Sequence, residues 1–321
     1  MKHSTVLQFA PGAALLAVAL LVPPSRAAAP AAPPICDSAS ATIVGTPGND
    51  SIQGTPRDDV IAGLGGHDVI HGARGNDVIC GGPGADRIFG EEGGDDLFGD
   101  GGTDVVRGGP SLDWLNGAQG RDHLFGGARR DVILAAGHGL VHGGSGNDLI
   151  RGFREHSRVY GDAGRDYLVG WLRIGSDQVI DGGPDVNGLE LDLRQQPGSP
   201  EVPWNEATIN LAHGMVTTDG QRAKIFGSFH GIRVGSPRSA LHWTLIGTKE
   251  PDALSILAVP PRPVAEYGRG GDDHLAGGNG DDLLDGGSGY DRAYAAEGVD
   301  TCISIEAPLY TDTGCDTTER R

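Results

Sequence analysis

The chain has 321 residues, of which 55 are glycine and only 5% are aromatic, a composition that argues against conventional cores filled with large side chains. Its formal net charge is -18, and only three residues are lysine. Such a surface repels polyanions, so we expect no nucleic-acid partner.

Residues 1–28 are expected to be a secretory signal peptide. Lys2 and His3 precede an apolar run from Ala13 to Val22, and small residues then offer a cleavage site between Ala27 and Ala29. The apolar run is about half of the ~20 residues that cross a bilayer, and no later segment is more suitable. We therefore expect a protein secreted by the general route, with no membrane anchor.

Four cysteines in an exported chain predict two disulfides. Of the three connectivities that four cysteines allow, we favour the local pairs, Cys36 with Cys80 and Cys302 with Cys315. Free buried thiols are the alternative.

A short N-terminal cap, residues 29–44, leads into a repeat that begins at Gly45. Ten consecutive units of nine residues keep the same register, from GTPGNDSIQ to GGARRDVIL. The sixth residue of each unit is Asp and the eighth is apolar. Glycines at the first and fourth places allow a tight turn, and the last three places form a short strand. The eighth residue then points inward while the seventh and ninth face solvent.

Two units complete one coil of eighteen residues, and stacked coils bury a thin line of Ile, Leu and Val. Ile43 fits that line, so the stack is expected to begin there. Stacking also brings sixth-place carboxylates of successive coils together, where neighbouring negative charges repel by roughly 1 to 4 kcal/mol per pair. A cation must offset this repulsion. Calcium fits best, because it accepts six to eight oxygen ligands in flexible geometry, whereas zinc prefers His or Cys.

These units resemble the RTX, or haemolysin-type, calcium-binding repeats, with the pattern G-G-x-G-x-D-x-(apolar)-x. The resemblance implies an all-β fold, a right-handed parallel β-roll or β-helix solenoid that binds several Ca²⁺ ions between its turns. It covers residues 45–185, degenerate after residue 134, and returns in a second block, residues 247–303, before a tail at 304–321. By the family's scheme the expected calcium ligands are sixth-place aspartates: Asp50, Asp68, Asp77, Asp86, Asp95, Asp104, Asp122, Asp148, Asp166, Asp273, Asp282 and Asp291.

Turns alternate between two edges of the stack. On the first edge, turns that begin at Gly45, Gly63, Gly81, Gly99 and Gly117 all keep the fourth-place glycine. On the second edge, Arg57, Ser111 and Arg129 replace it. We therefore predict tight calcium binding on the first edge and weak or absent binding at Asp59, Asp113 and Asp131, unless side chains are tolerated at the fourth place.

Residues 186–246 lose the repeat but keep alternating apolar residues. Leu189, Leu191 and Leu193 predict one strand, Ile209 and Leu211 another, and Asp219-Gly220 a turn. A degenerate β-helical linker and a separate small β domain are both compatible with this pattern. Trp204 and Trp243 could stack on a sugar, but tryptophans in β-rich segments more often belong to the core.

The sequence shows no catalytic residues and no organic cofactor site. It contains no H-E-x-x-H, G-x-S-x-G or phosphate-loop motif. We expect a non-enzymatic calcium-binding protein, structural or adhesive, whose partner is a cell surface or a polysaccharide. The alternative is a polysaccharide lyase or epimerase with a groove in the middle region, near Arg222, Lys224 and His230. The sequence does not predict the oligomeric state.

Overall fold

The structure is a computed structural model. It describes residues 35–154, 156–173, 177–194, 204–218, 221–226, 229–235, 240–257, 263–308 and 315–319. The expected signal peptide lies outside these residues. Among them no helix is long and apolar enough to span a bilayer.

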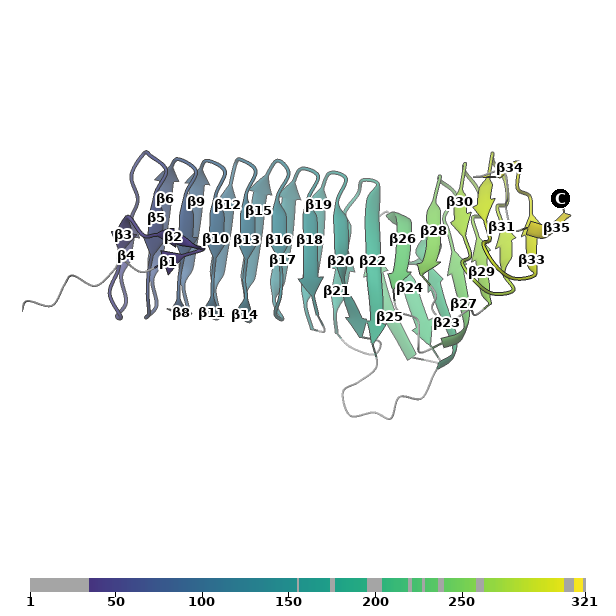
Figure 1. The fold of residues 1–321 in the computed structure, drawn as a ribbon, viewed down its shortest axis with the longest axis horizontal. Coiled ribbons are helices and arrows are strands. Elements are labelled where there is room, and N and C mark those ends of the chain that lie inside the picture. The colour runs from purple at the N-terminus through teal and green to yellow at the C-terminus, as the bar shows by residue number, and fades with distance from the viewer. Residues whose placement is uncertain are drawn as a thin grey trace, which may run out of the picture. The chain divides into compact units, whose positions relative to one another are not determined.

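The described residues belong to one compact unit, and most of its strands lie in two large sheets in which nearly all neighbouring strands are parallel (Figure 1). The 14-stranded sheet consists, in order, of β3 (Ile43–Val44), β5 (Val60–Ala62), β7 (Val78–Cys80), β10 (Asp96–Phe98), β13 (Trp114–Asn116), β16 (Val132–Leu134), β18 (Leu149–Phe153), β20 (Tyr167–Arg173), β22 (Asn187–Arg194), β26 (Phe229–Gly235), β28 (Ala253–Leu257), β30 (His274–Ala276), β32 (Arg292–Tyr294) and β34 (Ala307–Pro308).

The 16-stranded sheet consists of β4 (Ser51–Gln53), β6 (Val69–Arg74), β9 (Arg87–Glu92), β12 (Val105–Gly109), β15 (His123–Ala128), β17 (Leu140–Ser145), β19 (Arg158–Ala163), β21 (Val179–Asp181), β25 (Gln221–Phe226), β24 (Met215–Thr218), β23 (Trp204–Asn210), β27 (Ala240–Ile246), β29 (Val264–Tyr267), β31 (Leu283–Asp285), β33 (Asp300–Ile303) and β35 (Cys315–Glu319). The chain alternates between the two sheets, as expected for an RTX-like β-roll. The fold predicted from the repeat is confirmed.

The register between neighbouring strands equals the two-unit period. Ile61 in β5 lies opposite Ile79 in β7, which is eighteen residues later, and Ile70 in β6 lies opposite Ile88 in β9. These eighth-place side chains are all fully buried. Ile43 lies opposite Ile61, so the stack begins where the sequence predicted. Each of these coils thus buries one apolar side chain from each sheet.

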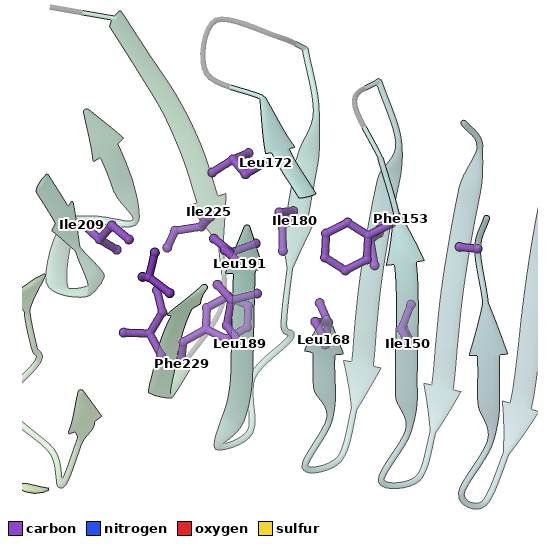
Figure 2. Close-up of a cluster of buried hydrophobic side chains, with 14 of the residues drawn as sticks. Ile150, Phe153, Leu168, Leu172, Ile180, Leu189, Leu191, Ile209, Ile225 and Phe229 are labelled. Atoms are coloured by element: carbon purple, nitrogen blue, oxygen red, sulfur yellow. The ribbon is translucent and has the colours of Figure 1, made fainter. Parts of the chain in front are cut away.

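The middle region continues the same stack. β22 pairs with β20 on one side and with β26 on the other, and its Leu189 and Leu191 are buried in the core (Figure 2). The other sheet accommodates the lost repeat differently, because β23, β24 and β25 form an antiparallel meander within it. Asn187–Arg194 is the strand predicted around the three leucines.

One detail of this region differs from the prediction, and a second lies outside the described residues. Ile209 is in a strand, but Leu211 begins the 3₁₀ helix η1 (Leu211–His213), so the predicted strand ends one residue too late. The bend follows from capping, because the side chain of Asn210 accepts a hydrogen bond from the backbone N–H of His213. The predicted turn at Asp219-Gly220 lies outside the described residues.

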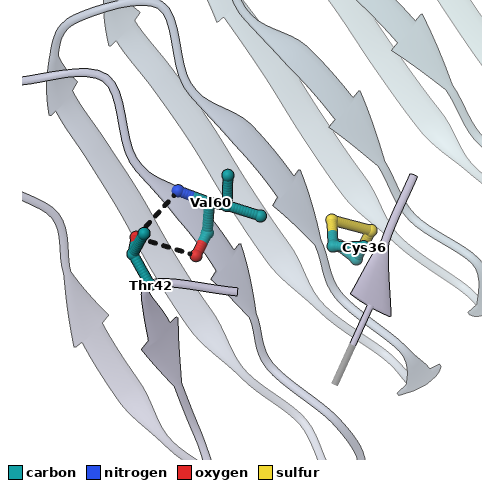
Figure 3. Close-up of a disulfide and its surroundings, with 4 residues drawn as sticks. Cys36, Thr42 and Val60 are labelled. Carbon is teal, nitrogen blue, oxygen red and sulfur yellow. Dashed lines mark hydrogen bonds between the residues drawn. A yellow bond between two sulfur atoms is a disulfide. The ribbon is translucent and has the colours of Figure 1, made fainter. Parts of the chain in front are cut away.

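Both predicted disulfides are present. Cys36, in the hairpin of β1 (Ile35–Cys36) and β2 (Ala39–Ser40), is bonded to Cys80 at the end of β7 (Figure 3). Nearby, the hydroxyl of Thr42 donates to the carbonyl of Val60 and accepts from its N–H, which fixes the chain entering the first coil. Cys302 is bonded to Cys315, so the second disulfide joins the adjacent strands β33 and β35.

Candidate calcium-binding turns

The sixth-place aspartates form hydrogen-bonded ladders along both edges. In most of them the Oδ1 atom accepts a hydrogen bond from the backbone N–H of the sixth-place residue one coil earlier. On the first edge Asp68 donates to Asp86 at 2.8 Å, and Asp86 donates to Asp104 at 2.8 Å. On the second edge Asp77 donates to Asp95 at 2.8 Å. One carboxylate oxygen of each aspartate therefore has a structural role, since it satisfies a buried backbone donor.

The other carboxylate oxygen has no protein partner in most of these aspartates. Buried Oδ2 atoms without a hydrogen-bond partner belong, among the described residues, to Asp68, Asp77, Asp86, Asp95, Asp104, Asp113, Asp131, Asp148, Asp166, Asp273, Asp282 and Asp291. A buried and unpaired carboxylate is strongly unfavourable unless it is neutralised by a proton or a cation. These oxygens therefore indicate that a cation or a proton belongs beside them.

Burial and mutual repulsion raise the pKa values of the carboxyls of Asp104, Asp113 and Asp131. Loss of hydration is the largest cause, and the negative charges of neighbouring sixth-place aspartates add to it. The pKa is raised to about 7 in Asp104, to about 7 in Asp113 and to about 8 in Asp131. Both causes disfavour the bare anion, so a bound cation would be stabilised by the same environment.

The donor set fits calcium. Among the described residues, no three or more His, Cys, Asp and Glu side chains gather closely enough to hold a metal ion by themselves. A cation at these turns would therefore take an Asp Oδ2 together with main-chain carbonyls. An all-oxygen set of this kind suits a hard cation with flexible coordination and does not suit zinc.

The turns of the first edge stack very regularly. Three of them form a parallel sheet of their own, with β8 (Pro83–Gly84), β11 (Gly101–Gly102) and β14 (Gln119–Gly120). Gly102 has φ +149° and lies against the carbonyl of Gly84, which a Cβ atom at Gly102 would overlap. The fourth-place glycine is therefore required by close packing between coils as well as by its own backbone conformation.

The second edge departs from this pattern at the turn backbone and not at the carboxylates. Pairing between β12 and β9 stops after Arg107, before the turn that contains Ser111. Arg129 adopts a positive φ of 74°. Asp113 and Asp131 are nevertheless as buried as Asp104, and they have the same partnerless Oδ2. At Asp113 and Asp131 the weaker binding therefore depends on the turn carbonyls alone. The weaker binding predicted at Asp59, Asp113 and Asp131 stays a prediction.

A second class of sixth-place aspartate was not predicted. In Asp50, Oδ2 accepts from the backbone N–H of Thr46 at 2.6 Å and from its hydroxyl at 2.9 Å. Thr55 makes the same two bonds to Asp59, at 2.7 and 2.8 Å. Thr248 likewise donates to Asp252 through both groups. Asp50 was expected to be a good calcium ligand, but it has less free bonding capacity than Asp68 or Asp86.

These threonines occupy the second place of the first units of each repeat block. The recurring G-T in GTPGND, GTPRDD and GTKEPD was the available signal, because a hydroxyl beside a turn carboxylate is a common hydrogen-bond donor. We call these three aspartates threonine-capped.

Uncharged residues take the sixth place in the middle of the chain. The Oδ1 atom of Asn187 accepts from the N–H of Asp166 at 2.8 Å, and its Nδ2 donates to the carbonyl of Asp185 at 2.7 Å. On the first edge, the strand register puts Gly139, Ser157 and Gln178 at the sixth place in the three coils that follow Asp122. The second-edge ladder thus continues through the uncharged Asn187, whereas on the first edge Gly139 has no side chain that could accept the bond.

The remaining predicted ligands all occupy ladder positions. Asp148 accepts from the N–H of Asp131 at 2.8 Å, although these two residues are only seventeen apart in sequence. In the second block, Asp273 accepts from Asp252 and Asp291 accepts from Asp273. The structure adds two ladder bonds that were not predicted. Asp300 accepts from the N–H of Asp282, and Glu306 accepts from the N–H of Asp291.

Of the residues considered for a sugar-binding or catalytic role, the structure describes the side chain of Trp243. Trp243 is 1% exposed and belongs to the core. The side chains of Trp204, Arg222, Lys224 and His230 are outside the described ones.

A family model, the RTX calcium-binding nonapeptide repeat in four copies, matches residues 44–79, 81–106, 98–133, 107–141, 142–172 and 267–302. These matches together cover more than half of the chain. No curated protein sequence matches it.

Proposed function

Because this chain belongs to the family with RTX calcium-binding nonapeptide repeats, we propose that it is a secreted protein whose turns bind several Ca²⁺ ions and that folds as it binds them. The observation that carries this proposal is the set of buried Oδ2 atoms, such as those of Asp86 and Asp104, that have no protein partner. A divalent cation would supply the missing interaction and offset the repulsion between successive carboxylates.

Binding of this kind stabilises the folded chain by linkage. A site that exists only in the folded state adds RT ln(1 + [Ca]/Kd), so ~8 sites with calcium at ~10 times Kd contribute on the order of 11 kcal/mol. The whole stability of an ordinary domain is about 5–15 kcal/mol. Calcium would therefore decide whether the chain folds, because the line of core side chains is thin.

Export and folding are coupled in this proposal. Extracellular calcium modules bind with Kd values on the order of 10⁻⁴ to 10⁻³ M, so the chain would stay unfolded where calcium is scarce and fold outside the cell. The two disulfides support an oxidising destination. The expected signal peptide at residues 1–28 supports the same route.

We place the folded protein among structural or adhesive, non-enzymatic proteins of the cell exterior. Among the described residues, the ladders account for the sixth-place aspartates, so the repetition of Asp along the chain does not call for a glycosidase. Incubation with uronic-acid polymers tests this part, because release of unsaturated or epimerised products would contradict it.

Equilibrium dialysis of the mature chain against Ca²⁺, with Mg²⁺ as the matched control, tests the binding itself. We expect several calcium ions per chain and little magnesium, because magnesium demands a stricter octahedron. A chain that binds no calcium at millimolar concentration would contradict the proposal.

A further inference from the structure

Glu266 occupies a core position in the second repeat block. It lies in β29, where its strand neighbours are Leu245 in β27 and Leu284 in β31. Both leucines are fully buried, and Glu266 is buried to the same extent. A carboxylate therefore lies between two apolar side chains of the adjacent strands, at a core position. The nonapeptide pattern does not account for it.

Only one oxygen of this carboxylate has a partner among the described residues. Oε2 accepts a hydrogen bond from the backbone N–H of Ala276 at 2.8 Å, across the coil in β30. Oε1 is buried without any hydrogen bond. Burial is the main cause that raises the pKa of Glu266 well above its usual value. An ionised group in this position needs a positive charge beside it.

A second partnerless carboxylate oxygen lies at the same place. The Oδ2 atom of Asp282 is buried without a partner and packs against Gly277, the residue next to Ala276. The negative charge of Asp282 also contributes to the raised pKa of Glu266, which reflects their closeness. Two acidic side chains from different coils thus lie beside the Ala276-Gly277 segment, and each has one buried oxygen without a partner.

The position of Asp282 in its ladder explains why an extra carboxylate would be useful there. Its Oδ1 accepts from the N–H of Val264, which takes the sixth place in the preceding coil. Most other ladder aspartates follow a coil that provides its own carboxylate, as Asp104 follows Asp86. The coil before Asp282 has a valine instead, and the nearby Glu266 belongs to that same coil.

We propose that Glu266 and Asp282 together bind a Ca²⁺ ion inside the coil, with Glu266 replacing the sixth-place aspartate that Val264 lacks. The proposal rests on the proposed calcium-binding function of the turns, and it assigns one ion to a residue outside the repeat pattern. Oε1 of Glu266 and Oδ2 of Asp282 are the protein oxygens for this ion, and each already has its second oxygen fixed by a backbone N–H.

The test compares the number of calcium ions bound by full-length mature variants in equilibrium dialysis. We expect Glu266→Gln and Asp282→Asn each to lose one ion, and the double variant to lose the same single ion, because both residues serve one site. Gln and Asn preserve the hydrogen bonds from Ala276 and Val264. Asp96→Asn is the matched control, because Asp96 is an exposed carboxylate on the strand β10, outside the turns and the ladders, and it should bind as many ions as the unmodified chain.

Glu266→Leu provides a second variant that does not depend on the hydrogen bond to Ala276. The substitution introduces leucine, which is the residue at the paired positions of both adjacent strands. We expect this variant to fold in calcium and still to bind one ion fewer. If Glu266→Gln and Glu266→Leu retain every ion at unchanged affinity, Glu266 is a buried protonated acid and the inference is wrong. If the unmodified chain binds no calcium, the proposed function fails and this inference fails with it.

Discussion

The backbone N–H of Asp86 donates to Oδ1 of Asp104, one coil later, at 2.8 Å, while Oδ2 of Asp104 is buried without a partner. The same side chain thus connects two coils through one oxygen and leaves the other for a cation. This division explains how one residue type can be both structural and calcium-binding, and it makes the two roles separable by mutation.

Asp104→Asn should separate them. Asparagine can keep the Oδ1 hydrogen bond, as Asn187 does in its own rung. We expect the metal-free chain to be no less stable than the unmodified one, because an unpaired buried charge is removed, and the gain in Tm on adding calcium to be smaller. Asp104→Ala should also lose the ladder bond and cost about 1–3 kcal/mol in either condition. Thermal unfolding with and without calcium measures both effects. An equal loss of stability in the metal-free Asp104→Asn and Asp104→Ala variants would contradict this prediction.

Acidification should stabilise the metal-free chain. The pKa of Asp104 is about 7 in the folded chain, above the ~3.9 of an unfolded aspartate. The folded state therefore binds protons more tightly, so this contribution is fully present below about pH 4 and is lost as the pH rises through about 7.

We predict that Tm in metal-free buffer rises from about pH 8 to about pH 5, and that calcium affinity falls over the same window because protons compete with the ion. Titrations at several pH values measure both trends. A metal-free Tm that falls steadily on acidification over this range would show that the ladder carboxyls are not the dominant titrating groups.

The threonine caps should stabilise the first coils without any metal. Thr55→Val removes the hydroxyl that donates to Oδ2 of Asp59 and leaves the backbone donor in place. We expect a loss of about 0.5–1.5 kcal/mol in free energy of unfolding, with no change in the number of calcium ions bound. Thr55→Ser is the matched control and should be close to the unmodified chain. A change in ion stoichiometry would mean that Asp59 binds calcium after all.

The two edges should differ in affinity. We predict that Asp86→Asn lowers the calcium affinity measured by titration more than Asp113→Asn does. The turn of Asp86 keeps its fourth-place glycine, whereas the turn of Asp113 has Ser111 in that place. Both carboxylates are equally buried, so any difference reports on the turn carbonyls. Equal effects would refute the asymmetry.

Much of the fold could be predicted because the repeat fixes the register directly. The nine-residue period places Ile61 opposite Ile79, and both local disulfides follow the expected pairing. The meander of β23, β24 and β25 could not be predicted, because no period survives in that segment and pairing there is decided by tertiary packing.

Within the site, the aspartates were identifiable but their two oxygens were not distinguishable. The ladder bond from Asp86 to Asp104 depends on side-chain direction, which the sequence pattern does not specify. Thr46 was overlooked because the second place varies between units. Glu266 lies outside every unit, and its burial follows only from strand register.

The most direct measurement is circular dichroism of the mature chain, with its disulfides intact, during a thermal scan in calcium and again after all metal has been removed. We predict a cooperative transition from β-structure in calcium, and less β-structure with a much lower Tm at neutral pH without it. An unchanged spectrum and an unchanged Tm in the metal-free sample would show that the sixth-place carboxylates need no shared cation.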